Sequence, residues 1–283
     1  MWIALSQTYW RKHRNADAES AAAKAAAVAP ENAAVLQGLV IYYSETNQNL
    51  KAARAASKYA SKVPENKAAR GRAGDLYFQA AQPLLEQQKF VEASAILKEG
   101  IANAEPSAQL TLALGVAYYG LRRFDDAADS FLRTIDIAPE TEQPYEFLGK
   151  ILEQIPARLP EVGRRFAVYE ASHPETANAY LLHAKVLDAQ SLEPETSLRL
   201  IEKSISINSA DASAHFEAGA VLDRLQRFAE AAVEFERAAQ LAPSDAATHY
   251  RLARDYDRIG KHEAAQAERE KHARLVQAQE AIR

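Results

Sequence analysis

Seven histidines and 38 acidic residues supply the side chains that most often bind metal ions or transfer protons. His215 and His249 occupy equivalent places in two copies of a pattern that recurs about every 34 residues. We expect one such step to be too long for both side chains to reach the same ion. His183 and His272 fall at positions expected to pack, and His262 lies beside an expected turn. The histidines therefore indicate a core or surface role, and we predict no metal site.

Catalytic motifs are also missing from the sequence. It contains no glycine-rich phosphate loop, no nucleophile elbow and no HExxH motif. The chain has no cysteine, which excludes disulfides, thiolate metal sites and a cysteine nucleophile. We predict no enzymatic activity and no cofactor for this chain.

Charge and hydropathy narrow the classes of partner. The formal net charge is −4 with acidic and basic residues mixed, so no broad basic field is present to attract nucleic acid or anionic lipid. No run of 18 apolar residues occurs, so no membrane span is expected. We expect a soluble protein of the cytoplasm or the periplasm, with any targeting segment outside this chain.

The elements that position these side chains follow from the recurring pattern. Two stretches match when their glycines are aligned. The first contains Leu114-Gly115, Tyr118, Phe124, Ala127, Phe131 and Pro139, and the second contains Ala218-Gly219, Leu222, Phe228, Ala231, Phe235, Ala238 and Pro243. A period of about 34 residues is typical of stacked helix–turn–helix units. We expect the aromatic side chains of this pattern to form the core, and its glycines and alanines to let helices approach closely.

These residues resemble the signature of the tetratricopeptide repeat family. The resemblance implies an all-α fold, a right-handed α-solenoid of about eight helix–turn–helix repeats with a C-terminal capping helix. We expect a single domain over residues 1–283, with repeats near 1–30, 31–64, 65–106, 107–141, 142–176, 177–211, 212–245 and 246–283. The capping helix is expected over Glu263–Ile282.

Two repeats fit the register only with insertions, when Gly115 is counted as position eight. The second repeat fits with Gly38 at position eight and two inserted residues, and the third needs seven inserted residues near Ala80–Lys89. Because Pro83 is compatible with a first turn or a kink, a prolonged helix and a projecting elbow are both open. The insertion is then either a local accommodation or a lip that contacts a partner.

In similar proteins, positions two, five, nine, twelve and thirteen of each first helix line a concave groove that binds partners. The N-terminal half of this expected groove is largely apolar and suits a hydrophobic segment. The C-terminal half mixes charges and suits selection by charge pattern. Alternatively, the apolar side chains of the N-terminal half are partly buried, and the charges of the C-terminal half are simply solvated. The candidate partner-binding residues are Leu39, Tyr42, Tyr43, Asp75, Phe78, Leu112, Val116 and Tyr119 in the first half, and Lys150, Lys185, Phe216, Tyr250 and Arg254 in the second.

The family's dicarboxylate clamp is not expected in this chain. The clamp needs asparagine at position nine and lysine at position five, and neither occurs here. Lys150, Lys185 and Arg254 stand at position nine in three of the last four repeats. We hypothesise that they meet an acidic partner through charge-assisted contacts.

Three functional classes remain open, and we favour a binding scaffold for a protein or peptide partner. The alternatives are a substrate-presenting region of a larger enzyme, for example a glycosyl- or sulfotransferase, and a self-assembling subunit of an envelope or secretion complex. Trp2, Leu5 and Tyr9 form an apolar stripe that the alanine-rich second helix covers only in part. This end therefore suggests either missing upstream residues or a homodimer or partner interface.

Overall fold

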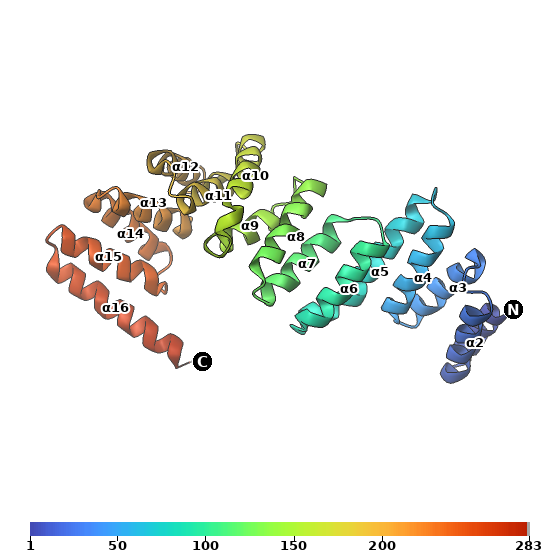
Figure 1. Cartoon of the computed structure of the whole chain (residues 1–283). Helices are drawn as coiled ribbons and strands as arrows, with labels where there is room; N and C mark the ends of the chain where they lie inside the picture. Colours follow the sequence, from blue (N-terminus) through green and yellow to red (C-terminus); the bar gives the residue numbers. More distant parts are fainter. Residues whose placement is uncertain (282–283) are drawn as a thin grey trace. The chain divides into compact units, whose positions relative to one another are not determined.

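The structure is a computed structural model that describes residues 1–281, and within them it is all-α with no β-strand. Figure 1 shows the helices following one another as antiparallel hairpins. Ile282 and Arg283, which we expected to complete the last repeat, lie outside the described residues. The α-helices are α1 (Trp2–Arg11), α2 (Asn15–Val28), α3 (Ala33–Glu45), α4 (Asn49–Lys62), α5 (Lys67–Glu86), α6 (Phe90–Asn103), α7 (Ala108–Gly120), α8 (Phe124–Ile137), α9 (Gln143–Lys150), α10 (Leu159–Ser172), α11 (Ala177–Ala189), α12 (Pro194–Ile207), α13 (Ala212–Arg224), α14 (Phe228–Leu241), α15 (Ala246–Arg258) and α16 (His262–Glu280). The expectation of an all-α chain of helix–turn–helix repeats is confirmed.

Local sequence sets where the helices begin and how the hairpins turn. Asn32, Ser107 and Asp245 each precede a first helix, and each side chain accepts a hydrogen bond from a backbone N–H of the first turn. The short connection inside each of several hairpins contains one residue with left-handed backbone, such as Arg122 (φ 57°) or Gly260 (φ 76°). This conformation reverses the chain tightly enough for two helices to pack side by side.

The packing divides the chain into two compact units. Unit 1 is Met1–Pro144, and unit 2 is formed by the residues from Tyr145 onward. Each unit contains hairpins in which consecutive helices are in contact. A single continuous domain over the whole chain remains a prediction.

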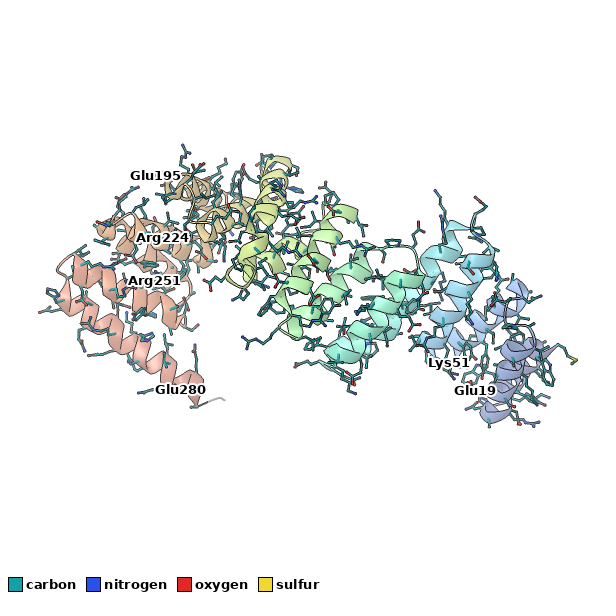
Figure 2. All side chains as sticks on the ribbon, in the orientation of Figure 1. Glu19, Lys51, Glu195, Arg224, Arg251 and Glu280 are labelled. Atoms are coloured by element: carbon teal, nitrogen blue, oxygen red, sulfur yellow. The ribbon has the colours of Figure 1, made fainter. Side chains whose placement is uncertain are left out.

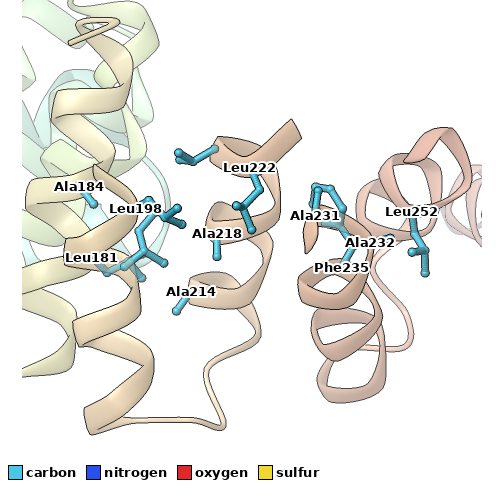
Figure 3. Close-up of a cluster of buried hydrophobic side chains, with 12 residues drawn as sticks. Leu181, Ala184, Leu198, Ala214, Ala218, Leu222, Ala231, Ala232, Phe235 and Leu252 are labelled. Atoms are coloured by element: carbon cyan, nitrogen blue, oxygen red, sulfur yellow. The ribbon is translucent and has the colours of Figure 1, made fainter. Parts of the chain in front are cut away.

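Aromatic side chains fill the contacts between neighbouring helices in both units, as the repeat pattern predicts. Phe131 and Phe235 are completely buried, and each ring lies against the glycine of the preceding helix. A Cβ on Gly115 would lie 2.4 Å from Phe131 Cε1, and one on Gly219 would lie 2.8 Å from Phe235 Cε1. Figure 3 shows the corresponding cluster of unit 2, in which Phe235 lies among leucine and alanine side chains of α11–α15. The helices pack closely because the glycine leaves room for the ring.

The second hairpin corrects the predicted register. Helices α3 and α4 have 13 and 14 residues, the same as α7 and α8, and no insertion is present. Val40 therefore takes the place of Gly115, and Leu36, Leu39 and Tyr43 take buried packing positions. Gly38 instead faces the first hairpin, where a Cβ would lie 2.5 Å from Ile3 Cγ2. The prediction was wrong because this glycine accommodates a different neighbour.

The third hairpin accommodates its extra residues by lengthening its first helix. Helix α5 has 20 residues and contains Pro83, so the projecting elbow is excluded. A proline has no N–H and cannot donate to the carbonyl four residues before it, which here belongs to Gln79. The side-chain amide of Asn49 donates to that Gln79 oxygen at 3.5 Å. A residue of the preceding hairpin thus partly replaces the missing bond.

Replacing Pro83 with alanine should stabilise unit 1. Proline inside a helix costs about 3 kcal/mol relative to alanine, and its smaller unfolded-state entropy offsets about 1 kcal/mol of this. We expect Pro83→Ala to raise the free energy of unfolding by about 2 kcal/mol, measured by urea denaturation followed by circular dichroism. Gln79→Ala on the same helix serves as the control and should change little. An unchanged or lower midpoint for Pro83→Ala would contradict this.

The fifth hairpin departs most from the repeat. Helix α9 has only 8 residues and is followed by two 3₁₀ turns, Leu152–Gln154 and Pro156–Arg158. Because a proline disfavours helical backbone in the residue before it, Ile155 takes φ −125° and ψ 47°. Leu152 was expected within a regular first helix, and it remains buried in the 3₁₀ turn instead. Leu152 thus keeps its buried packing position although the regular helix ends at Lys150.

The two end helices differ in polarity. In α1, Trp2, Leu5 and Tyr9 are half-buried, as a stripe partly covered by α2 would be. Within α16 only Ala265 and Glu268 are buried, which fits a polar capping helix. None of the described helices is long and apolar enough to cross a bilayer.

Candidate functional site

Three of the candidate residues in unit 1 are core side chains. Leu39, Tyr42 and Tyr43 are buried, with Tyr42 only 1% exposed, so the prediction that they line an accessible groove is wrong. The register correction in the second hairpin explains the error, because Leu39 and Tyr43 move to packing positions. Ile41 takes position nine instead and is 44% exposed. Sequence reasoning missed it because Gly38 set the register.

A polar cluster surrounds the buried tyrosines. The Tyr42 hydroxyl donates to Glu19 Oε2 at 3.4 Å, and Gln48 Nε2 donates to the same oxygen at 3.0 Å. Lys51 Nζ pairs with Glu19 Oε1 at 2.5 Å and lies 5.5 Å from the centre of the Tyr43 ring. Glu19 and Lys51 are labelled next to each other in Figure 2. Burial first, and then Glu19, raise the pKa of Tyr42 to about 12. These residues hold α2, α3 and α4 together.

The other five candidates of unit 1 stay accessible on α5 and α7. These two helices are in contact, so their side chains form one neighbouring set. Asp75 is exposed, and the four apolar and aromatic members are half-buried. Tyr119 meets Phe124 edge to face, with ring centres 6.2 Å apart. We call this set the α5–α7 surface, formed by Asp75, Phe78, Leu112, Val116 and Tyr119.

In unit 2, many charged side chains on the first helices pair with one another. Lys185 Nζ on α11 lies 3.1 Å from Glu217 Oε1 on α13. Arg224 on α13 pairs with Asp188 on α11. The Lys185 side chain is thus engaged within the chain. This pairing weakens the hypothesis that Lys185 meets an acidic partner.

The same pairing continues from α13 to α15. Arg258 pairs with Asp223 and, at 2.9 Å, with Asp255 Oδ1, while Arg251 Nη1 lies 3.7 Å from Asp223 Oδ2. Figure 2 shows Arg224 and Arg251 on these neighbouring helices. Asp255 is completely buried, and burial together with Asp223 raises its pKa above the ordinary value despite Arg258. We call the pairs on α11, α13 and α15 the ion-pair ladder.

The remaining candidates of unit 2 lie on the surface or at its edge. Tyr250 is 49% exposed, and the Arg254 guanidinium lies 5.8 Å from its ring centre. Lys150 is exposed, with Nζ 5.1 Å from the Phe147 ring centre. Phe216 is half-buried and packs edge to face on Phe235 at 5.6 Å. Of these, Lys150, Tyr250 and Arg254 have side chains that a partner can reach.

His215 and His249 have matching buried environments. Nδ1 of His215 contacts Glu234 Oε2 at 2.6 Å, and its Nε2 contacts the Ser209 carbonyl oxygen at 3.2 Å. His249 repeats this arrangement with Glu268 Oε2 at 2.5 Å and the Pro243 carbonyl oxygen at 3.1 Å.

Both rings lie between a side-chain carboxylate and a backbone carbonyl oxygen. The sequence predicted packing positions for both but not the carboxylate partners, although Glu234 and Glu268 share the same spacing. No group of three or more histidine, aspartate or glutamate side chains suited to a metal ion occurs within residues 1–281.

The comparisons with known proteins agree with this geometry. Residues 78–141 match the family model described as tetratricopeptide repeat. Residues 78–141, from α5 to the end of the fourth hairpin, therefore belong to the tetratricopeptide repeat family. No curated protein sequence matches the chain.

Solved structures of tetratricopeptide repeat type share the fold. A structure of PilF from Pseudomonas aeruginosa aligns with TM-score 0.56 at 18% identity, covering 76% of this chain and 99% of that one. MamA (41-end) from Desulfovibrio magneticus RS-1 aligns with TM-score 0.52 at 20% identity, covering 61% and 96%. TTC0263, a thermophilic TPR protein of Thermus thermophilus, aligns with TM-score 0.51 at 21% identity, covering 60% and 91%. At these identities the likeness concerns the fold alone.

Proposed function

We propose that this tetratricopeptide repeat chain is a non-catalytic scaffold that holds a protein or peptide partner on the first helices of its repeats. The observation that carries the proposal is the α5–α7 surface. It keeps four apolar and aromatic side chains accessible on two neighbouring helices. Scattered single apolar residues on a surface need no explanation, but a set of this kind is typical of a binding site.

The chemistry of this surface favours a hydrophobic partner segment. Leu112 and Val116 are one helical turn apart on α7, and Tyr119 follows after three residues, so the three share one face of the helix. An amphipathic helix lays its apolar side chains on such a face. Asp75 beside this face on α5 is suited to a basic residue at the edge of the partner.

A pull-down with matched variants tests the proposal. The full chain, Val116→Asp and Val91→Asp are immobilised, and retained proteins are quantified by mass spectrometry. Val91 is 65% exposed on α6 and controls for the added charge. We expect partners retained by the wild type and by Val91→Asp to fall by about tenfold or more with Val116→Asp, because a charge in an apolar contact is costly.

Folding and identity of the surface are checked in the same experiment. Circular dichroism must show the same helix content for all three proteins, and Tyr119→Ala supplies a milder second variant of the same surface. If every protein retained by the wild type is retained equally by Val116→Asp and Tyr119→Ala, the α5–α7 surface is not the binding site.

A further inference from the structure

A cleft in unit 2 lies beside the irregular fifth hairpin. It has a volume of about 680 Å³ and is open to solvent. Its apolar lining includes Pro156, Leu159, Pro160, Leu187 and Leu192. Its size falls in the range of binding pockets, and its lining is mostly apolar with a few polar groups, as such pockets usually are.

Residues of the irregular fifth hairpin and of α11 line this cleft. The 3₁₀ turn Pro156–Arg158 stands before α10, in the place that Leu121–Arg123 takes between α7 and α8, while the regular first helix is already interrupted at Leu152–Gln154. Gly163 on α10 adds no side chain, and a Cβ there would lie 3.3 Å from Gln190 Nε2 on α11. At the rim Leu192 is 51% exposed. Pro156 and Gly163 thus both line the cleft, which lies between α10 and α11.

Most charged side chains near the cleft are engaged in ion pairs within the chain. Glu161 lies 3.9 Å from Arg158, and Glu170 Oε2 contacts His183 Nδ1 at 2.7 Å. Asp188 pairs with Arg224. Arg164 lines the cleft, is exposed, and has no carboxylate within ion-pair distance in the part of the chain that the structure describes. Among the residues that line the cleft, the accessible charge is therefore that of Arg164.

We propose that this cleft binds the apolar anchor side chain of an acidic amphipathic segment of a partner protein, with a neighbouring carboxylate of that segment paired to Arg164. The inference rests on the proposed scaffold function and adds a second site with a defined chemistry. Leu187 and Leu192 contact the anchor, and Gln190 offers a hydrogen bond to the backbone of the segment. The charge complementarity at Arg164 selects an acidic segment over a basic one.

Fluorescence anisotropy with synthetic probes tests this site on the full chain. The probe is a labelled helical peptide of about 15 residues with leucine on one face and glutamate beside it. Two matched peptides carry lysine in place of glutamate, or alanine in place of leucine. We expect the glutamate–leucine peptide to bind, and each matched peptide to bind at least about tenfold more weakly, a difference of about 1.4 kcal/mol.

Variants with matched controls assign the binding to the cleft. Leu192→Asp and Arg164→Glu should each weaken the glutamate–leucine peptide by about tenfold or more. Val233→Asp and Arg237→Glu introduce the same changes at exposed positions of α14 and should leave affinity within about twofold. Arg164→Glu should also favour the lysine peptide.

Two results would overturn the inference. One is that the wild type fails to bind the probe at about 100 µM, and the other is that both cleft variants bind it as the wild type does. A parallel measurement with Val116→Asp separates the two proposals. If that variant alone loses the probe, the scaffold function stands and the cleft is not a site. If only the cleft variants lose the probe, the cleft is a site independent of the α5–α7 surface.

Discussion

Phe235→Ala is expected to lower the free energy of unfolding of unit 2 by about 3–5 kcal/mol. The Phe235 ring is completely buried, lies against Gly219, and packs on Phe216 at 5.6 Å between ring centres. Removing it leaves a cavity that the surrounding helices fill only in part. The loss extends beyond α14 because each hairpin of a repeat stack is stabilised by its neighbours.

Hydrogen exchange read by mass spectrometry measures this effect locally, and urea denaturation measures it globally. Val233→Ala on the same helix is the control, since that side chain is 59% exposed and should matter by less than about 0.5 kcal/mol. If Phe235→Ala lowered the free energy of unfolding by less than about 1 kcal/mol, the ring would not be a main source of stability for the packing of these helices.

A second substitution tests the glycine–ring contact directly. In the wild type, Gly219→Leu should destabilise unit 2 because even a Cβ would lie 2.8 Å from the Phe235 ring. In the Phe235→Ala background the same leucine enters the space that the ring vacated. We therefore expect the two changes to be strongly non-additive, with the double variant more stable than the sum of the single effects implies.

Glu268→Ala is expected to destabilise the last hairpin by about 3 kcal/mol. The Glu268 side chain is 10% exposed, and it contacts His249 at 2.5 Å and Lys271 Nζ at 2.7 Å. Its removal leaves the buried His249 ring without its acceptor. Breaking a buried pair by deleting one partner costs more than the pair contributes, because the other polar group stays desolvated. Exchange protection of α15 and α16 should report the loss.

The same carboxylate should make stability depend on acid pH. Burial acts to raise the pKa of Glu268, but hydrogen bonds from Lys271 and His249 outweigh it and hold the pKa below the ordinary 4.5. A carboxyl whose pKa is depressed in the folded state contributes stability above its unfolded pKa and loses it as pH falls through the folded value. Stability supplied by Glu268 is therefore fully present above the ordinary carboxyl pKa of 4.5 and is lost as the pH falls through the lower folded-state pKa.

Glu268→Gln isolates this contribution. The variant should show a flatter loss of stability than the wild type when unfolding is measured between about pH 3 and about pH 7. Glu270→Gln, at an exposed position of the same helix, should follow the wild-type curve. Parallel curves for the wild type and Glu268→Gln would mean that another group carries the acid dependence.

The sequence predicted the repeat architecture because the same contact between a glycine and an aromatic ring recurs. Leu114-Gly115 with Phe131 and Ala218-Gly219 with Phe235 carry a steric pair, a ring against a missing Cβ, and that pair is visible as spacing. The same reasoning failed at Gly38, whose missing Cβ serves Ile3 on another helix. A glycine in the sequence shows that something approaches closely, but it does not show which element approaches.

The candidate surfaces were predictable only in part. The sequence identified Phe78, Leu112, Val116 and Tyr119 by position, and they remain accessible. It did not predict that Lys185 would be neutralised by Glu217, because pairing between hairpins depends on their relative rotation. It also missed the cleft at Gly163, since Pro156 signals an irregular turn without showing what space that turn leaves open.

The ion-pair ladder has a consequence for repeat order. Glu217 and Arg251 stand at the same place in α13 and α15, the sixth residue of each helix, yet they carry opposite charges. Deleting residues 212–245 would join α12 directly to α15 and set Lys185 against Arg251 in place of Glu217. Repulsion between these two like charges would disfavour packing of α15 against α11. The charges therefore favour packing of each hairpin against its own neighbour over packing against another hairpin. A chain shortened in this way should fold less stably, even though every remaining hairpin keeps its sequence.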